Sequence, residues 1–318
     1  MVKTPVLFIT FARPEYARKT FEGIKAAKPQ KLYFYSNKGR VEKEGEIERN
    51  DIIRSYVNEI DWECELKIWF RDECVNAYDS LKGAISWLFE NESQGIILEE
   101  DCVPTLAFFS FVDCMIEKFK DNKDVWYISG DNFYDLNPSG TDYIFSRYHW
   151  MYGWATWSNR WNRIKWGDFN IQEFLDKKIS YKLYKTKLQG RNREAQIYSI
   201  KDMLLKTNCW DYGFGLTIDY NMGFGAFPKT QLIHNIGLSG EHHGKPTTSF
   251  VNVKPQYTND EYIIENEPSE VKADMEFDYQ FHNIRRMSMS KRVIMWKKII
   301  RFFLSENNIY KLKKRLKQ

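Results

Sequence analysis

Short apolar runs alternate with helical stretches along the first 130 residues, and this alternation constrains the fold more than any other feature. Strands are predicted at 5–11, 31–35, 64–70, 95–98 and 125–129. Helical spacing separates them, at 13–27, 42–60, 78–90 and 108–119. Buried parallel strands form continuous apolar runs, and a helix after each strand returns the chain to the same end of the sheet. The pattern therefore predicts an α/β fold with a mostly parallel, Rossmann-like sheet flanked by helices.

The pattern changes after residue 130, where aromatic residues and glycines crowd 143–166 and 210–227. We expect one domain over 1–250, with a nucleotide-binding half at about 1–105 and an acceptor half at about 106–250. Residues 251–290 are predicted to be an acidic linker or a segment that lies on the surface, because 258–278 contain eight acids. A basic, helical tail is predicted at 291–318.

Composition excludes several classes of protein. With 43% hydrophobic and 16% aromatic residues in 318, the chain has ample apolar surface to bury, so it is not disordered. Five cysteines without a Cys-x-x-Cys pair argue against a disulfide scaffold or zinc finger, and favour a reducing, cytoplasmic compartment. No apolar run reaches the roughly 18 residues of a membrane span, and the N-terminus resembles a strand more than a signal peptide.

The small net charge conceals an asymmetry. Residues 291–318 contain ten Lys or Arg and one acid, and because the whole chain carries +4, the other 290 residues sum to −5. The basic surface that nucleic acid requires is therefore not predicted. As a helix, the tail places Trp296, Ile299 and Phe303 on one face, with Lys297 and Arg301 toward the other. Such a helix binds anionic membranes peripherally, here the inner face of the cell membrane, or packs on the body with a solvated basic end. Both alternatives stay open.

Three acids follow the apolar strand at 96–98: Glu99, Glu100 and Asp101. In open α/β sheets, ligands bind at the carboxyl ends of the strands. Adjacent carboxylates there are costly unless a cation compensates them, and Mg²⁺ or Mn²⁺ with a diphosphate would do so. The alternative is a solvated acidic loop.

Three further motifs have both a functional and a structural interpretation. The aromatic stretch 145–157 suits a platform for a sugar face, or an aromatic core. Asp211, held among aromatic residues, suits a general base, or a helix cap. The histidines of the Gly-rich stretch 235–244 suit a metal or phosphate ligand, or a plain loop.

The order of these motifs resembles bacterial GT-A-type glycosyltransferases of the nucleotide-diphospho-sugar transferase superfamily, of the family-2-like or hemolytic-protein-like kind. It is more distantly similar to the N-acetylglucosaminyltransferase I family. The resemblance covers about 5–244 and rests on stretches 8–14, 98–104, 128–133, 153–157, 210–212 and 235–237.

The resemblance implies a role for each matching residue. Asp101 would contact the metal, Glu99 would belong to the cofactor site, and Glu100 would hold the ribose or a metal-bound water. Asp211 would be the general base. Further contacts are implied for the nucleotide or its phosphates (Arg13), the base (Asn37), the diphosphate (His242 or His243) and the acceptor (Trp154 and Trp210).

This chain departs from the family pattern at three places. The triplet is Glu-Glu-Asp where Glu-Asp-Asp is usual, Asn37 stands where an Asp is frequent, and an Asn-Leu-Gly stretch after the third strand is replaced by Cys74–Tyr78. The expected activity is a metal-dependent, inverting transfer of a sugar from a nucleoside diphosphate, UDP being favoured, to a glycan or lipid-linked acceptor in bacterial surface polysaccharide synthesis. A sugar-phosphate nucleotidyltransferase and a non-catalytic sugar-binding module are the alternatives.

Overall fold

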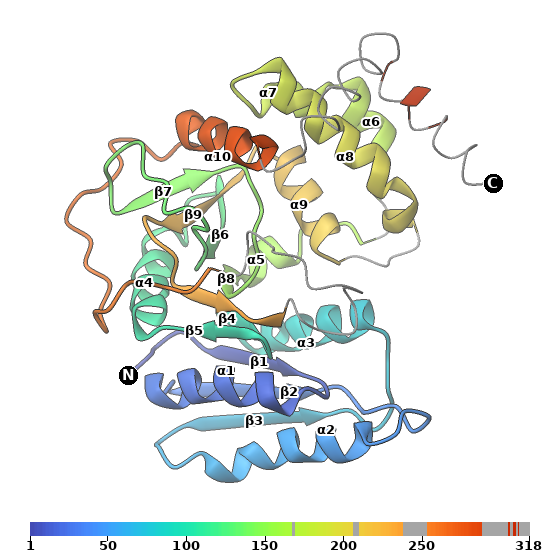
Figure 1. Cartoon of the computed structure of the whole chain (residues 1–318), viewed down its shortest axis with the longest axis vertical. Helices are drawn as coiled ribbons and strands as arrows, with labels where there is room; N and C mark the ends of the chain where they lie inside the picture. Colours follow the sequence, from blue (N-terminus) through green and yellow to red (C-terminus); the bar gives the residue numbers. More distant parts are fainter. Residues whose placement is uncertain are drawn as a thin grey trace.

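The first four strands of the main sheet form its parallel half (Figure 1). The computed structural model describes residues 1–166, 169–205, 210–237 and 253–287, with four residues of the tail, Ser305, Asn308, Ile309 and Lys311. In this half β1 lies between β2 and β4, with Val6 opposite Leu32 and Ile96, and β2 pairs in parallel with β3. The strands are β1 (Val6–Thr10), β2 (Lys31–Ser36), β3 (Glu65–Phe70) and β4 (Gln94–Glu99).

The second half of the sheet mixes strand directions. Strand β8 (Trp154–Trp157) lies antiparallel between β4 and β6 (Val125–Ser129). Strand β9 (Phe224–Pro228) is parallel to β6, and β7 (Tyr143–Ser146) closes the edge antiparallel to β9. The order is β3-β2-β1-β4-β8-β6-β9-β7, so all strands but β8 and β7 run the same way. The prediction of a mostly parallel α/β sheet flanked by helices is confirmed.

Alternating side chains of β1 pack against helices on opposite faces of the sheet. Val6 and Phe8 share a core with helices on one face: α1 (Pro14–Ala27), α2 (Glu46–Arg54) and α4 (Leu106–Lys118). Leu7 and Ile9 share a second core with helices on the other: α3 (Ala77–Asn91), α5 (Ser158–Trp161) and α9 (Trp210–Tyr220). Successive side chains of a strand point to opposite faces, so a run of apolar residues is buried on both.

The helical stretch expected at 42–60 is shorter and divided. Helix α2 begins after Gly45, whose φ of 69° is left-handed, and it passes into the 3-10 helix η1 (Ser55–Glu59). Glycine adopts that conformation without steric cost, which explains the late start of the helix.

A smaller helical layer lies beside α9. Its own core contains Phe174, Leu183, Ile197 and Leu216. The helices of this layer are α6 (Ile171–Asp176), α7 (Ile179–Lys182) and α8 (Lys187–Leu205). A two-stranded ribbon also joins β5 (Cys102–Pro104) to β10 (Ile233–Asn235).

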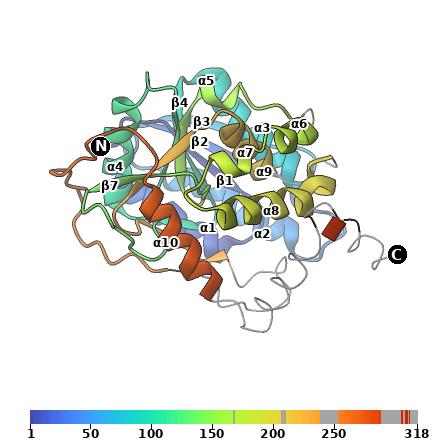
Figure 2. The same cartoon turned by 90° about the horizontal axis from the view of Figure 1, so that it is seen from above.

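The segment expected as an acidic linker is packed on the body in its described part. The Asp142 carboxylate accepts hydrogen bonds from the backbone N–H groups of Glu265 and Asn266, both at 2.7 Å. Helix α10 (Met275–Met287) follows and lies beside β7 (Figures 1 and 2). There the Ser146 hydroxyl donates to the buried Asp278 carboxylate at 2.5 Å. The described part of this segment is therefore hydrogen-bonded to the body, as expected of a segment that lies on the surface.

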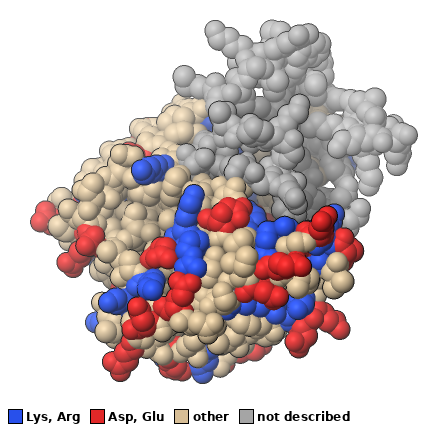
Figure 3. All heavy atoms as spheres, turned by 60° about the horizontal axis from the view of Figure 1, so that its bottom comes forward, with Lys and Arg blue, Asp and Glu red and all other residues tan. Residues whose placement is uncertain are grey.

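Charges of both signs are mixed on the face seen in Figure 3. Lys and Arg side chains lie next to Asp and Glu on this face. Most of the tail falls outside the described residues, although Ile309 is described and buried. Across the part of the chain that the structure describes, no helix is long and apolar enough to span a membrane.

Candidate functional site

The acidic triplet lies in the turn from β4 to β5, at the carboxyl ends of the parallel strands. Arg13, one residue before α1, pairs with two of its members. Its Nε lies 2.5 Å from Oε1 of Glu100, and its Nη2 lies 2.9 Å from Oδ2 of Asp101. The protein thus supplies one of the cations that adjacent carboxylates require.

Both carboxylate oxygens of Glu100 accept hydrogen bonds from the protein. Glu100 is buried, and its second carboxylate oxygen accepts the backbone N–H of Phe11 at 2.7 Å. Burial raises the pKa of Glu100, against the opposing charge of Arg13. With one hydrogen bond to each oxygen, Glu100 fixes the start of α1 to the end of β4, and the ribose contact implied by the resemblance would have to share these oxygens with Arg13 and Phe11.

The negative charge around Glu99 is offset only in part by Arg13. Burial first, and then the charges of Asp101 and Asp211, raise the pKa of Glu99 to about 8. Asp211 lies in the first turn of α9, is exposed, and follows the buried Trp210. The fold thus lets the charge of Asp211 act on Glu99, although the two residues are more than 100 positions apart in sequence.

Asp101 is covered by the strand that follows the loop at 229–232. The Ile236 backbone N–H donates to the Asp101 carbonyl at 2.9 Å. A Cβ built on Gly237 would lie 1.8 Å from Oδ2 of Asp101, so only glycine allows this approach. The Asp101 side chain remains 17% exposed.

The residues present fit a divalent cation that a diphosphate holds in part. Among the described residues no group of three His, Cys, Asp or Glu side chains is arranged to bind a metal by itself. Mg²⁺ typically takes one or two protein carboxylates and completes its shell with phosphate oxygens and water. Asp101 offers such an oxygen, and the raised pKa of Glu99 indicates a place where added positive charge is favourable.

Asn37 is used within the fold. Its Oδ1 accepts the backbone N–H of Val75 at 3.2 Å, and its Nδ2 donates to the Val75 carbonyl at 2.8 Å. Oδ1 also accepts the backbone N–H of Lys38 at 3.0 Å. The amide therefore ties the end of β2 to the loop before α3, which is a structural use of the position where the resemblance implies a base contact.

The two tryptophans expected on the acceptor side lie in the core. Trp154 is fully buried in β8, and its ring stacks on Trp210 with centroids 5.7 Å apart. Trp210 is 8% exposed and packs with Phe214 in the same cluster. The structure gives both indoles a packing role, which was the alternative for this aromatic stretch. His242 and His243 lie outside the described residues.

Two site residues were not singled out from the sequence. Tyr152 is half-buried, and the charges of Asp131, Glu99 and Asp211 all act on its phenol, whose pKa burial raises. Asp131 is buried beyond the end of β6 and accepts a hydrogen bond from Gln231 at 2.9 Å. Tyr152 belongs to the aromatic stretch and Asp131 to the motif at 128–133, but only the folded chain shows that the Tyr152 N–H binds Asp131 and that the charge of Glu99 acts on the Tyr152 phenol.

Part of this chain is similar in structure to proteins of known structure. No protein-family model matches the chain, and no curated protein matches its sequence. The mannosyltransferase PcManGT from Pyrobaculum calidifontis, solved with GDP-Man and Mn²⁺, has a TM-score of 0.36 at 12% identity, over 51% of this chain and 46% of its own. This chain thus aligns with less than half of that protein.

Two other solved structures show similarity of the same extent. A UDP-glucose pyrophosphorylase complexed with UDP-glucose has a TM-score of 0.29 at 6% identity, over 52% of this chain and 79% of its own. The apo-form glycosyltransferase GlyE of Streptococcus pneumoniae TIGR4 has a TM-score of 0.26 at 13% identity, over 72% and 55%. These values describe a partly shared arrangement of strands and helices, and the function proposed below rests on the residues of this chain.

Proposed function

We propose that this protein is a metal-dependent glycosyltransferase that moves a sugar from a nucleoside diphosphate, UDP being favoured, to a glycan or lipid-linked acceptor. One observation supports the proposal: the charge of Asp211, in the first turn of α9, acts on Glu99 at the end of β4, two residues before Asp101. A carboxylate that can take a proton thus faces carboxylates that can help to hold a cation and its diphosphate.

The proposed reaction is a single displacement. Asp211 accepts the proton of an acceptor hydroxyl, whose oxygen forms the new bond to the anomeric carbon. The bond from that carbon to the diphosphate breaks, and the diphosphate leaves with the electron pair. One displacement inverts the anomeric centre, and its transition state resembles an oxocarbenium ion. Mg²⁺ or Mn²⁺ held at Asp101 would offset the charge of the leaving diphosphate.

Asp211→Asn tests the base. The amide keeps the shape of the side chain and removes the proton acceptor, so kcat should fall about 10²- to 10⁴-fold while donor affinity changes little. The matched control is Asp121→Asn, an exposed carboxylate before β6 at the opposite edge of the sheet. If donor binding is lost and turnover per bound donor is normal, Asp211 is a ligand of the nucleotide instead.

Asp101→Asn tests the metal. Binding of UDP or GDP should depend on Mn²⁺ or Mg²⁺ in the wild type and lose that dependence in the variant, with transfer reduced about 10²-fold or more. Full activity in the presence of a chelator would contradict the proposal.

Product analysis separates the alternatives. A glycosyltransferase releases nucleoside diphosphate from a nucleotide sugar. A nucleotidyltransferase forms the nucleotide sugar from a nucleoside triphosphate and a sugar phosphate, with release of pyrophosphate. A sugar-binding module binds without turnover.

A further inference from the structure

The backbone of residues 147–153 is held against the end of β6. Three side chains at alternate positions hold it: Tyr127, Ser129 and Asp131. The Tyr127 hydroxyl donates to the Tyr148 carbonyl at 2.9 Å, and the Ser129 hydroxyl donates to the Trp150 carbonyl at 3.2 Å. The Tyr152 N–H donates to Oδ2 of Asp131 at 3.3 Å. The segment is therefore fixed by buried groups, and its conformation is set before any ligand binds.

Side chains of this segment alternate between two environments. Met151 is buried in the core around α9, and His149 reaches Asp219 on the same helix. The side chains at 148, 150 and 152 are aromatic and half-buried, and all pack in one cluster around Phe133 and Phe281. The side chains of His149 and Met151 thus point toward α9, and the aromatic row, which is Tyr148, Trp150 and Tyr152, points to the opposite side.

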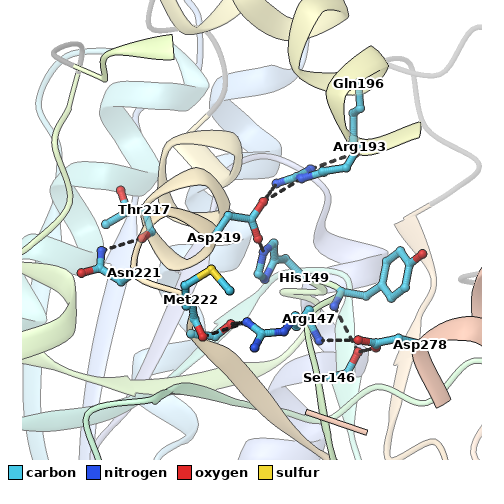
Figure 4. Close-up of polar contacts among 12 residues, drawn as sticks. Ser146, Arg147, His149, Arg193, Gln196, Thr217, Asp219, Asn221, Met222 and Asp278 are labelled. Atoms are coloured by element: carbon cyan, nitrogen blue, oxygen red, sulfur yellow. Dashed lines mark hydrogen bonds and ion pairs between the residues drawn. The ribbon is translucent and has the colours of Figure 1, made fainter. Parts of the chain in front are cut away.

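A buried network fixes this segment to the helix that carries Asp211 (Figure 4). The His149 Nε2 lies 2.8 Å from Oδ1 of Asp219, and the Arg193 Nε donates to Oδ2 at 2.7 Å. Asp219 is fully buried, and although burial acts to raise its pKa, Arg193 and His149 hold that pKa below its usual value. Asp219 and Asp211 both belong to α9. The network therefore holds the aromatic row in a fixed position relative to the helix of the proposed base.

Tyr152 is the member of the row that lies at the acids. The next residue, Gly153, has a φ of 78°, and a Cβ there would come within 2.5 Å of the Ile233 side chain. Ile233 begins β10, whose partner strand β5 starts one residue after Asp101. The turn at Gly153 therefore places Tyr152 beside the triplet, where the charges of Glu99 and Asp211 also reach it.

We propose that Tyr152 contacts the acceptor sugar, with Trp150 extending the same aromatic surface. This inference rests on the proposed function and names the acceptor as a carbohydrate that presents the C–H face of a pyranose ring. An aromatic ring offers that face a flat apolar surface, and the Tyr152 hydroxyl can donate to or accept from a sugar hydroxyl. The acceptor oxygen would then be held next to Asp211.

The test compares Tyr152→Ala and Tyr152→Phe with the wild type. Donors are UDP-glucose, UDP-N-acetylglucosamine and GDP-mannose, and acceptors are octyl glucoside, octyl galactoside, octyl mannoside and octyl N-acetylglucosaminide. For the active pair, we expect Tyr152→Ala to lower kcat/KM for the acceptor at least about tenfold, the equivalent of about 1.4 kcal/mol. Tyr152→Phe keeps the ring and should lose less. Slow hydrolysis of the donor without acceptor is measured for all three proteins, because it reports on the donor side alone.

Tyr257→Phe is the matched control. Its ring packs on Tyr262 in the segment that follows residue 252, away from the triplet, and we expect acceptor kinetics like those of the wild type. Thermal unfolding and donor hydrolysis establish that each variant is folded.

Three outcomes would overturn the assignment. Normal acceptor kinetics in Tyr152→Ala would overturn the assignment of Tyr152 and leave the proposed function standing. A loss confined to the donor KM or to donor hydrolysis would place Tyr152 at the donor sugar instead. If the wild type neither turns over nor binds any donor, the proposed function fails and this assignment fails with it.

Discussion

Gly237 controls how closely the backbone approaches Asp101. A Cβ at this position would lie 1.8 Å from Oδ2, so Gly237→Ala must displace the carboxylate or the end of β10. We expect this variant to lose at least about tenfold in Mn²⁺-dependent UDP or GDP binding, a free energy of about 1.4 kcal/mol, with little change in unfolding temperature. Isothermal titration calorimetry measures the first quantity. Unchanged binding would show that Asp101 is free to move without consequence.

Asp131 should give the protein a pH-dependent stability. Burial raises its pKa from 3.8 to about 8 in the folded state, despite hydrogen bonds from Gln231, Tyr152 and Ser129. Between these values the folded chain keeps a proton that the unfolded chain has lost. The free energy of unfolding should therefore fall as pH rises from about 4 to 8, by at most about 1.4 kcal/mol per pH unit.

Asp131→Asn removes this contribution. Urea unfolding at several pH values should show a flatter profile for the variant, while the exposed-site control Asp121→Asn keeps the wild-type slope. Parallel profiles for wild type and Asp131→Asn would mean that Asp131 is ionised in the folded protein.

Helix α9 contains two glycines whose surroundings differ. A Cβ on Gly213 meets only Trp166, at 3.8 Å, whereas a Cβ on Gly215 would approach the His149 ring at 3.0 Å. Alanine is favoured over glycine in a helix interior by about 0.5–1 kcal/mol. Gly213→Ala should therefore stabilise the protein by about that amount. Gly215→Ala should lose this gain, because it presses on the ring that binds Asp219. Equal stabilisation in urea unfolding would contradict this account.

Elements with a strong local pattern could be predicted from the sequence. The strands β1, β2 and β4 are buried on both faces, so the sequence shows them as continuous apolar runs, and the acids follow the run of β4. Strand β3 lies at the edge of the sheet and is partly exposed. By contrast α10 lies within an acidic stretch, and its buried face contains the polar Asp278 and His282 beside Phe277 and Phe281. The strands β7 to β10 are short, and the aromatic residues around them in the sequence give no strand pattern.

Parts of the site depend on contacts that no local pattern records. Arg13 was placed beside phosphates, and the structure pairs it with Glu100 and Asp101. The proximity of Tyr152 to Asp211 arises because β10, α9 and the segment 147–153 meet at one edge. Such long-range proximity is set by packing of whole elements, which local spacing does not encode.

Over the whole molecule, charge is divided between the body and the tail. Residues 291–318 carry +9 and the remaining chain −5. We propose that the tail attaches the protein to anionic membranes, and the alternative is that it packs on the body. The intact chain should sediment with phosphatidylglycerol vesicles at low salt and dissociate as salt screens the attraction over about 8–10 Å. A chain ending at Ser290 should stay folded and not sediment. An intact chain that ignores these vesicles would support the packed alternative.

The position of β8 has a consequence for how the chain acquires its structure during synthesis. Strand β8 lies between β4 and β6, although both precede it in the sequence. Until residue 157 has emerged from the ribosome, the growing chain exposes the unpaired edge of β4, and unpaired apolar edges promote aggregation. We therefore expect a fragment ending near residue 150 to aggregate, even though it contains four parallel strands and their helices. Folding of the sheet as one body must wait until the last of its eight strands in chain order, β9, has joined β6.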